Sequence, residues 1–81
     1  MIKILFFGAL SQHLPKNEFS LEFEQALTVA EILKRFSSDF PEIQNQIQQN
    51  LFYAVNQTQT SADHIVSDGD EIAFMPPFAG G

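Results

Sequence analysis

The stretch TVAEILKRF, residues 28–36, predicts one amphipathic helix. Thr28 and Glu31 have the spacing of a capping box, in which the hydroxyl and the carboxylate bond free backbone amides of the first turn. The apolar residues recur at positions i, i+3, i+4 and i+7 and therefore share one face of the helix; they are Val29, Ile32, Leu33 and Phe36. Because a helix with one apolar face must bury it against another layer, the segments around it decide the fold.

Alternating apolar and polar residues on both sides of this helix predict strands. In chain order, the predicted elements are strands at 1–7 and 19–23, the helix, a weaker helix from 41 to about 49, a strand at 51–55, at most a short strand at 65–66, and a last strand at 71–75. A short helical turn is also predicted within 11–14. The dipeptides Asn56-Gln57 and Asp68-Gly69 are typical of turns.

Two strands, a helix laid across them and further strands on the same sheet make an α+β layout. A ubiquitin-like β-grasp satisfies this order, with a mixed sheet packed on one main helix and the first and last strands parallel at its centre. We therefore predict a β-grasp domain at residues 1–75 and an extended, free C-terminal tail at residues 76–81.

The composition narrows the classes of function. The chain has 81 residues, which is enough for one domain, and its net charge of −6 makes nucleic-acid binding unlikely. An acidic surface suits a basic protein partner, or serves solubility alone. Without cysteine, there is no disulfide, thiolate metal site or cysteine nucleophile. The apolar runs are too short to span a membrane and no signal peptide is evident, so we expect a cytoplasmic location.

The tail PPFAGG, residues 76–81, combines features of a chain end that is inserted into the active site of an enzyme. Pro76 and Pro77 stop strand pairing and stiffen an extended exit. Gly80 and Gly81 let the backbone enter a tunnel too narrow for side chains, where the terminal carboxylate can be activated with ATP. The alternative is an ordinary frayed end.

Strand alternation also predicts an exposed apolar patch beside the tail. If the first and last strands are neighbours, Leu5, Phe7 and Met75 share the face opposite the helix. A contiguous patch of this kind usually marks a partner site. The alternative is that a loop or the second helix covers it.

Other candidate residues are weaker. His13 and His64 lie far apart in sequence, and surface or capping roles are favoured over a metal site. The acidic group formed by Asp63, Asp68, Asp70 and Glu71 lacks the spacing of a calcium loop, which favours a solvated turn. We expect no metal site and no active site of the chain's own.

Four segments together resemble the small, sulfur-carrying subunit of molybdopterin synthase. They are Phe6-Phe7, Ala54-Val55-Asn56-Gln57, Asp68-Gly69-Asp70-Glu71 and the ending FMPPFAGG at 74–81. The resemblance covers the whole chain, and the Pro-Pro-x-x-Gly-Gly ending is its most specific part. Residues 11–14 depart from it, because family members often carry an Arg-Glu pair there.

The resemblance implies a sulfur carrier that binds no cofactor itself. An E1-like enzyme would adenylate the Gly81 carboxylate with Mg-ATP, and a sulfur donor would convert the product to a thiocarboxylate. The tail would then enter the large synthase subunit, in a heterotetramer, and pass sulfur to cyclic pyranopterin monophosphate. Gly81 would be the reacting residue. The threading residues would be Pro76, Pro77, Phe78, Ala79 and Gly80, and the docking residues Leu5, Phe7 and Met75.

Three alternatives stay open at this point. The related sulfur carrier of thiazole synthesis shares the fold and the Gly-Gly end, but it generally lacks the Pro-Pro step at residues 76–77. A ubiquitin-like protein modifier would join Gly81 to lysines of other proteins after the same activation. A plain binding module would function without Gly81.

Overall fold

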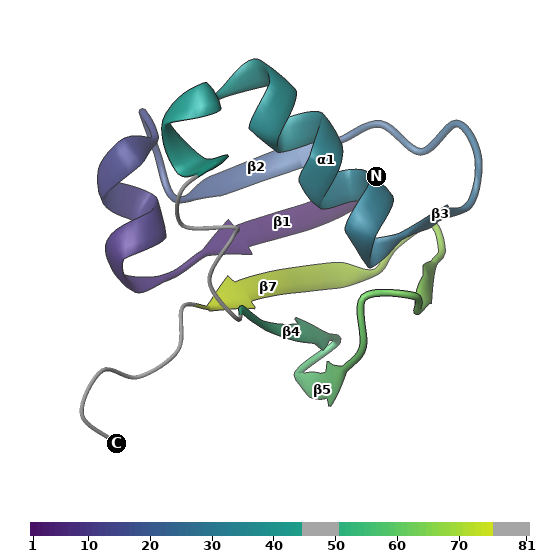
Figure 1. Cartoon of the computed structure of the whole chain (residues 1–81). Helices are drawn as coiled ribbons and strands as arrows, with labels where there is room; N and C mark the ends of the chain where they lie inside the picture. Colours follow the sequence, from purple (N-terminus) through teal and green to yellow (C-terminus); the bar gives the residue numbers. More distant parts are fainter. Residues whose placement is uncertain (45–50, 76–81) are drawn as a thin grey trace.

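In the part of the chain that the structure describes, the main helix packs across a five-stranded mixed sheet (Figure 1). The computed structural model describes residues 1–44 and 51–75. The strands of the main sheet lie in the order β2-β1-β7-β4-β5. Their bounds are β1 Ile2–Phe6, β2 Glu18–Leu21, β4 Phe52–Val55, β5 Thr58–Thr60 and β7 Glu71–Met75. A second, two-stranded sheet pairs β3 (Leu27–Thr28) with β6 (Ile65–Val66).

The first and last strands lie side by side at the centre of the main sheet. β1 and β7 run parallel, with Ile4 opposite Ile72 and Phe6 opposite Phe74. The other pairs of this sheet, β1 with β2, β4 with β7 and β4 with β5, are antiparallel. This arrangement confirms the predicted α+β, ubiquitin-like β-grasp fold.

Helix α1 (Val29–Asp39) begins at the predicted capping box. The Glu31 amide donates to the Thr28 hydroxyl at 3.2 Å, and the Thr28 amide donates to the Glu31 carboxylate at 2.8 Å. The latter bond, with one from the Thr28 hydroxyl, holds the pKa of Glu31 below its ordinary value. The loop before β6 accepts from two more first-turn amides, those of Val29 and Ala30. All four of these amides therefore have a partner.

The apolar stripe of α1 packs on the inner face of the main sheet, which we define as the face that carries Ile4 and Phe74. All four stripe residues are buried, at 0–7% exposure. Aromatic rings fill much of the core between the two layers. The Phe6 ring lies 5.3 Å from the ring centres of both Phe36 and Phe74 and 5.8 Å from that of Phe19. The core therefore combines residues from both ends of the chain with the central helix.

Several predicted boundaries were wrong. β2 ends at Leu21, before the predicted end at residue 23, and the helical turn predicted within 11–14 is the 3₁₀ helix η1 (Gly8–His13). The weaker helix predicted from residue 41 begins as a 3₁₀ helix, η2 (Pro41–Ile43), and its continuation over 45–49 lies outside the described residues. Strands β3 and β5 were not predicted, because two or three residues carry too little alternation to be recognised.

The β4–β5 hairpin is closed by two residues in left-handed backbone conformations. Asn56 has φ of 52° and Gln57 has φ of 70°, the signs required at both central positions of a type I′ turn. The turn predicted there is confirmed. Within residues 1–44 and 51–75, no helix combines the length and the apolar character that crossing a bilayer requires.

Candidate functional site: the outer face of the sheet

The face of the main sheet opposite α1, here called the outer face, carries its own set of apolar residues. Strand pairing places Leu5 of β1 opposite Ala73 of β7, and Ala73 opposite Ala54 of β4. Phe52 lies opposite Met75 in the next outward-facing position of the same β4–β7 pair.

Phe7 extends this set from the other side of β7. Its backbone is extended, and its amide donates to the Phe74 carbonyl at 3.0 Å, so the chain still runs along β7 at this point. Because Phe6 points into the core, Phe7 points to the outer face. Phe7, directly after β1, and Phe52, at the start of β4, thus flank Met75 from opposite sides of β7.

We call these residues the outer apolar patch; they are Leu5, Phe7, Phe52, Ala54, Ala73 and Met75. Phe7 is 47% exposed and Phe52 is 39% exposed, whereas Leu5, Ala73 and Met75 are half-buried. The structure therefore brings together the three residues that the sequence singled out, and their docking role stays a prediction.

Phe52 was missed in the sequence. Alternation within 51–55 places Phe52 and Ala54 on one face of their strand, which was the available signal. It does not show which strand lies next to β4, and the β4–β7 pairing decides that Phe52 meets Met75.

Polar residues border the outer apolar patch on three sides. Glu18 of β2 lies opposite Leu5, and Gln59 of β5 lies opposite Ala54. At the end where β1 begins, the Lys3 ammonium lies 3.9 Å from the Glu71 carboxylate. The apolar side chains thus reach the end of the sheet at which β7 stops, and Met75 is the last described residue there. The predicted tail residues Pro76 to Gly81 lie outside the described residues.

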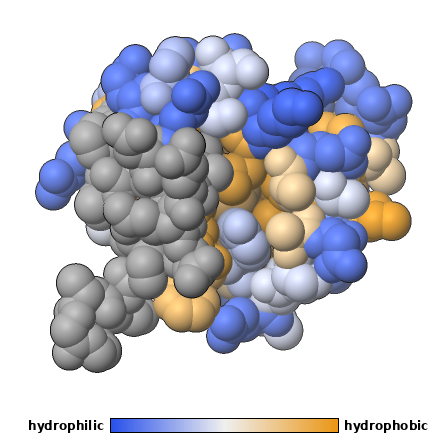
Figure 2. Space-filling model, in the orientation of Figure 1, coloured by the Kyte–Doolittle hydropathy of each residue, from blue (hydrophilic) through white to orange (hydrophobic). Residues whose placement is uncertain are grey.

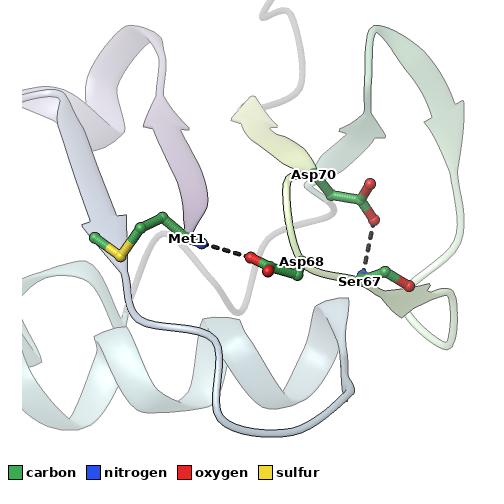
Figure 3. Close-up of polar contacts among 4 residues, drawn as sticks. All are labelled: Met1, Ser67, Asp68 and Asp70. Atoms are coloured by element: carbon green, nitrogen blue, oxygen red, sulfur yellow. Dashed lines mark hydrogen bonds and ion pairs between the residues drawn. The ribbon is translucent and has the colours of Figure 1, made fainter.

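The acidic side chains of the turn between β6 and β7 make hydrogen bonds and an ion pair within the domain (Figure 3). Asp70 accepts from the Ser67 amide at 2.8 Å and from the Asn56 side chain at 3.0 Å, and these bonds, in that order, lower its pKa. Asp68 forms an ion pair with the α-ammonium group of Met1. These contacts tie the turn to the start of β1 and to the β4–β5 hairpin, which agrees with a structural role.

The remaining candidates do not gather into a site. In the part of the chain that the structure describes, no three His, Cys, Asp or Glu side chains are placed to hold a metal ion. The His64 side chain is exposed, and its backbone carbonyl accepts from the Val29 amide at 3.0 Å. The side chain of His13 is outside the described part. Figure 2 shows hydrophilic residues over much of the helix side, with an apolar area near the middle of the view.

Three curated relatives carry the same name, molybdopterin synthase sulfur carrier subunit. The one from Caenorhabditis elegans is 32% identical over 88 residues and that from Mycobacterium tuberculosis 29% over 83 residues, each match covering 99% of this chain and 96% of the relative. The Escherichia coli relative is 61% identical over 31 residues, which is 38% of each chain. These relatives are subunits, and their name places them in a synthase.

Solved structures share the fold at low sequence identity. SAMP1 from Haloferax volcanii has a TM-score of 0.83 at 17% identity, covering 99% of this chain and 98% of that one. One chain in the complex of subunits 1 and 2 of the molybdopterin-converting factor from Helicobacter pylori has a TM-score of 0.66 at 18% identity, covering 99% and 97%. A model of the ThiS family matches residues 4–81. The chain therefore belongs to the ThiS family.

Proposed function

We propose that this chain is the sulfur carrier of a molybdopterin synthase, with Gly81 as the reacting residue. The observation that carries the proposal is the family match, which extends through residue 81 and so includes the Gly-Gly ending. Relatives that align over 99% of the chain are named as this carrier subunit. In this proposal, residues 1–75 form the folded domain, and residues 76–81 form the tail that enters the active site of the large synthase subunit.

The chemistry takes place on the carboxylate of Gly81 in three steps. An E1-like enzyme uses Mg-ATP to form an acyl-adenylate and releases pyrophosphate. A donor then supplies hydrosulfide, whose sulfur attacks the acyl carbon. AMP leaves with the electron pair of the broken acyl–oxygen bond, and a thiocarboxylate remains. In the large synthase subunit, the thiocarboxylate sulfur attacks a carbon of cyclic pyranopterin monophosphate and replaces an oxygen there. Water then cleaves the acyl–sulfur bond, which leaves the sulfur on the acceptor and restores the carboxylate.

One feature of the described part of the chain supports this proposal. β7 stops at the end of the sheet, beside the outer apolar patch, so the residues that follow Met75 start at a surface suited to a protein partner. Chemistry on a terminal carboxylate needs no cofactor held by the carrier. The large subunit would cover Leu5, Phe7 and Met75, while Pro76, Pro77, Phe78, Ala79 and Gly80 would thread into it.

The first test is the intact mass of the chain after incubation with an E1-like enzyme, Mg-ATP and a sulfur source. We expect a gain that corresponds to replacement of one oxygen by one sulfur, and no gain after deletion of Gly81. The loaded chain should then convert cyclic pyranopterin monophosphate to molybdopterin when the large subunit is added. An unchanged mass, with an activating enzyme shown to be active on another carrier, would overturn the proposal.

The acceptor separates this function from its two chemical alternatives. A carrier for thiazole synthesis would gain the same mass but give no molybdopterin. A protein modifier would form stable conjugates with lysines of other proteins, and SAMP1, which shares the fold, is named a small archaeal modifier protein. Formation of conjugates without molybdopterin would favour the modifier.

A further inference from the structure

β4 supplies an exposed aromatic ring at the end of the sheet where β7 stops. Phe52 is the first residue of β4, it is 39% exposed, and it lies opposite Met75. Its neighbour Tyr53 faces the core, where its ring lies 5.9 Å from that of Phe74. The packing of the core therefore makes no evident use of the Phe52 ring.

The side chains of the outer apolar patch become larger toward the end of the sheet at which β7 stops. The outward-facing residues of β1, β7 and β4, together with Phe7 just after β1, form successive rows across the sheet: charged residues Lys3 and Glu71, then Leu5, Ala73 and Ala54, then Phe7, Met75 and Phe52. The last row has the largest side chains and includes the two most exposed ones of the patch. It is also the row from which the chain continues to residue 76.

Covalent geometry limits how far a partner can lie from this row. Six residues follow Met75, and a fully extended chain spans at most about 3.6 Å per residue, so the carboxyl carbon of Gly81 stays within roughly 20 Å of Met75. A protein that encloses this carboxylate in an active site therefore has that site within roughly 20 Å of the row formed by Phe7, Met75 and Phe52, and contact with this row is the shortest way to bridge the distance.

We propose that Phe52 is a partner-contacting residue for the large synthase subunit, and that Phe7 and Phe52 bracket the start of the tail. This inference rests on the proposed function. Phe7 directly follows β1 and Phe52 begins β4, and these two strands flank β7, so a partner that contacts both rings is held at two points on either side of Met75. Without Phe52, the predicted contacts of Leu5, Phe7 and Met75 lie on β7 and on its β1 side only, whereas a contact at Phe52 adds a point on the β4 side and restricts rotation of the carrier on the partner.

The test measures affinity of the full chain for the purified large subunit from the same organism. We expect Phe52→Asp to weaken binding by about tenfold or more, as for a central apolar contact, and Phe52→Leu to retain most of it. Ile65→Asp is the matched control, because Ile65 is 60% exposed on β6, which is not in the main sheet. We expect this control to bind as the unchanged chain does.

A second measurement tests the bracketing. With the large subunit saturating, thiocarboxylated Phe52→Ala should transfer sulfur more slowly than the unchanged chain, because its tail is less well oriented. Phe52→Ala also replaces the Asp variant in the affinity test if the latter does not fold, with at least about threefold weaker binding expected.

The outcomes separate this inference from the function on which it rests. If the unchanged chain binds and transfers sulfur, and the Phe52 variants match it in both affinity and rate, the inference is wrong and the carrier function stands. If Ile65→Asp weakens binding as much as Phe52→Asp, the effect is one of charge and the inference is also wrong. If the unchanged chain neither binds the large subunit nor gains sulfur, both are overturned.

Discussion

The inner and outer faces of the main sheet are built from alternate residues of the same strands, yet they use their apolar side chains differently. On the inner face, Ile4, Phe6 and Phe74 are at most 1% exposed under α1. On the outer face, Phe7 and Phe52 are 47% and 39% exposed, although the same residue type occurs on both faces.

The difference shows that apolar character alone does not assign a residue to the core. The inner face is covered because one helix has a complementary stripe, and no described element packs over Phe7 or Phe52 in the same way. Apolar area that remains exposed is costly in water and becomes favourable when a partner covers it. The two faces are therefore expected to respond differently to substitution, one in folding stability and the other in binding.

The largest effect is expected on the inner face. Phe74→Ala removes a ring that stacks on Phe6 and meets Tyr53 edge-on, and it should reduce the free energy of unfolding by about 3–5 kcal/mol. Phe52→Ala on the outer face should cost less than about 1 kcal/mol. Chemical denaturation checks both, and equal losses would contradict the assignment of the two faces.

The next effect is expected in binding rather than in folding. Phe7→Asp and Met75→Asp should each weaken complex formation with the large subunit by about 2 kcal/mol, which is roughly thirtyfold. Titration calorimetry on folded variants gives the affinity, with Ile65→Asp as the control. Undiminished affinity in both variants would refute the docking role of these residues.

A smaller effect should follow from removing the helix cap. Thr28→Ala deletes the hydroxyl that accepts from the Glu31 amide and should lower the free energy of unfolding by about 1 kcal/mol. Thr28 caps α1, which packs on the inner face of the main sheet, and it is not part of the outer apolar patch. Affinity for the large subunit should therefore stay the same. A matching loss of affinity would show that the two faces are coupled.

The smallest effect is expected in the pH dependence of stability. Bonds from Ser67 and Asn56 lower the pKa of Asp70 in the folded chain, so its contribution is present above the unfolded pKa of about 3.9 and is lost as pH falls through the folded value. Asp70→Asn should therefore lose stability less steeply below about pH 4 than the unchanged chain. Denaturation at pH 7 and at several acidic pH values checks this, and parallel curves would contradict it.

Much of the fold could be predicted from local patterns. The capping box and the four-residue stripe define α1, and alternation in β1 and β7 separates the inner face from the outer one. These signals are local, because residues within one turn or two positions of each other must share a face. The same alternation placed Leu5, Phe7 and Met75 on one face.

Other features depended on pairing between distant segments. β3 and β5 are too short to have a pattern of their own, and they are recognised only through their partners β6 and β4. Phe52 joins the outer apolar patch because β4 lies beside β7 with Phe52 opposite Met75. A register shift of one residue would have placed Phe52 in the core, so this position follows from packing of the whole sheet.

The sequence by itself therefore determined the main helix and the facing of the central strands, since each depends on neighbouring residues, and it supplied the Gly-Gly ending on which the proposed function rests. Only the tertiary structure decided which side chains flank Met75 and how the acidic turn is used. Asp70 bonds Asn56, which is 14 positions away, and Phe52 meets Met75, which is 23 positions away. Contacts at such separations depend on the strand order and register that the complete core selects.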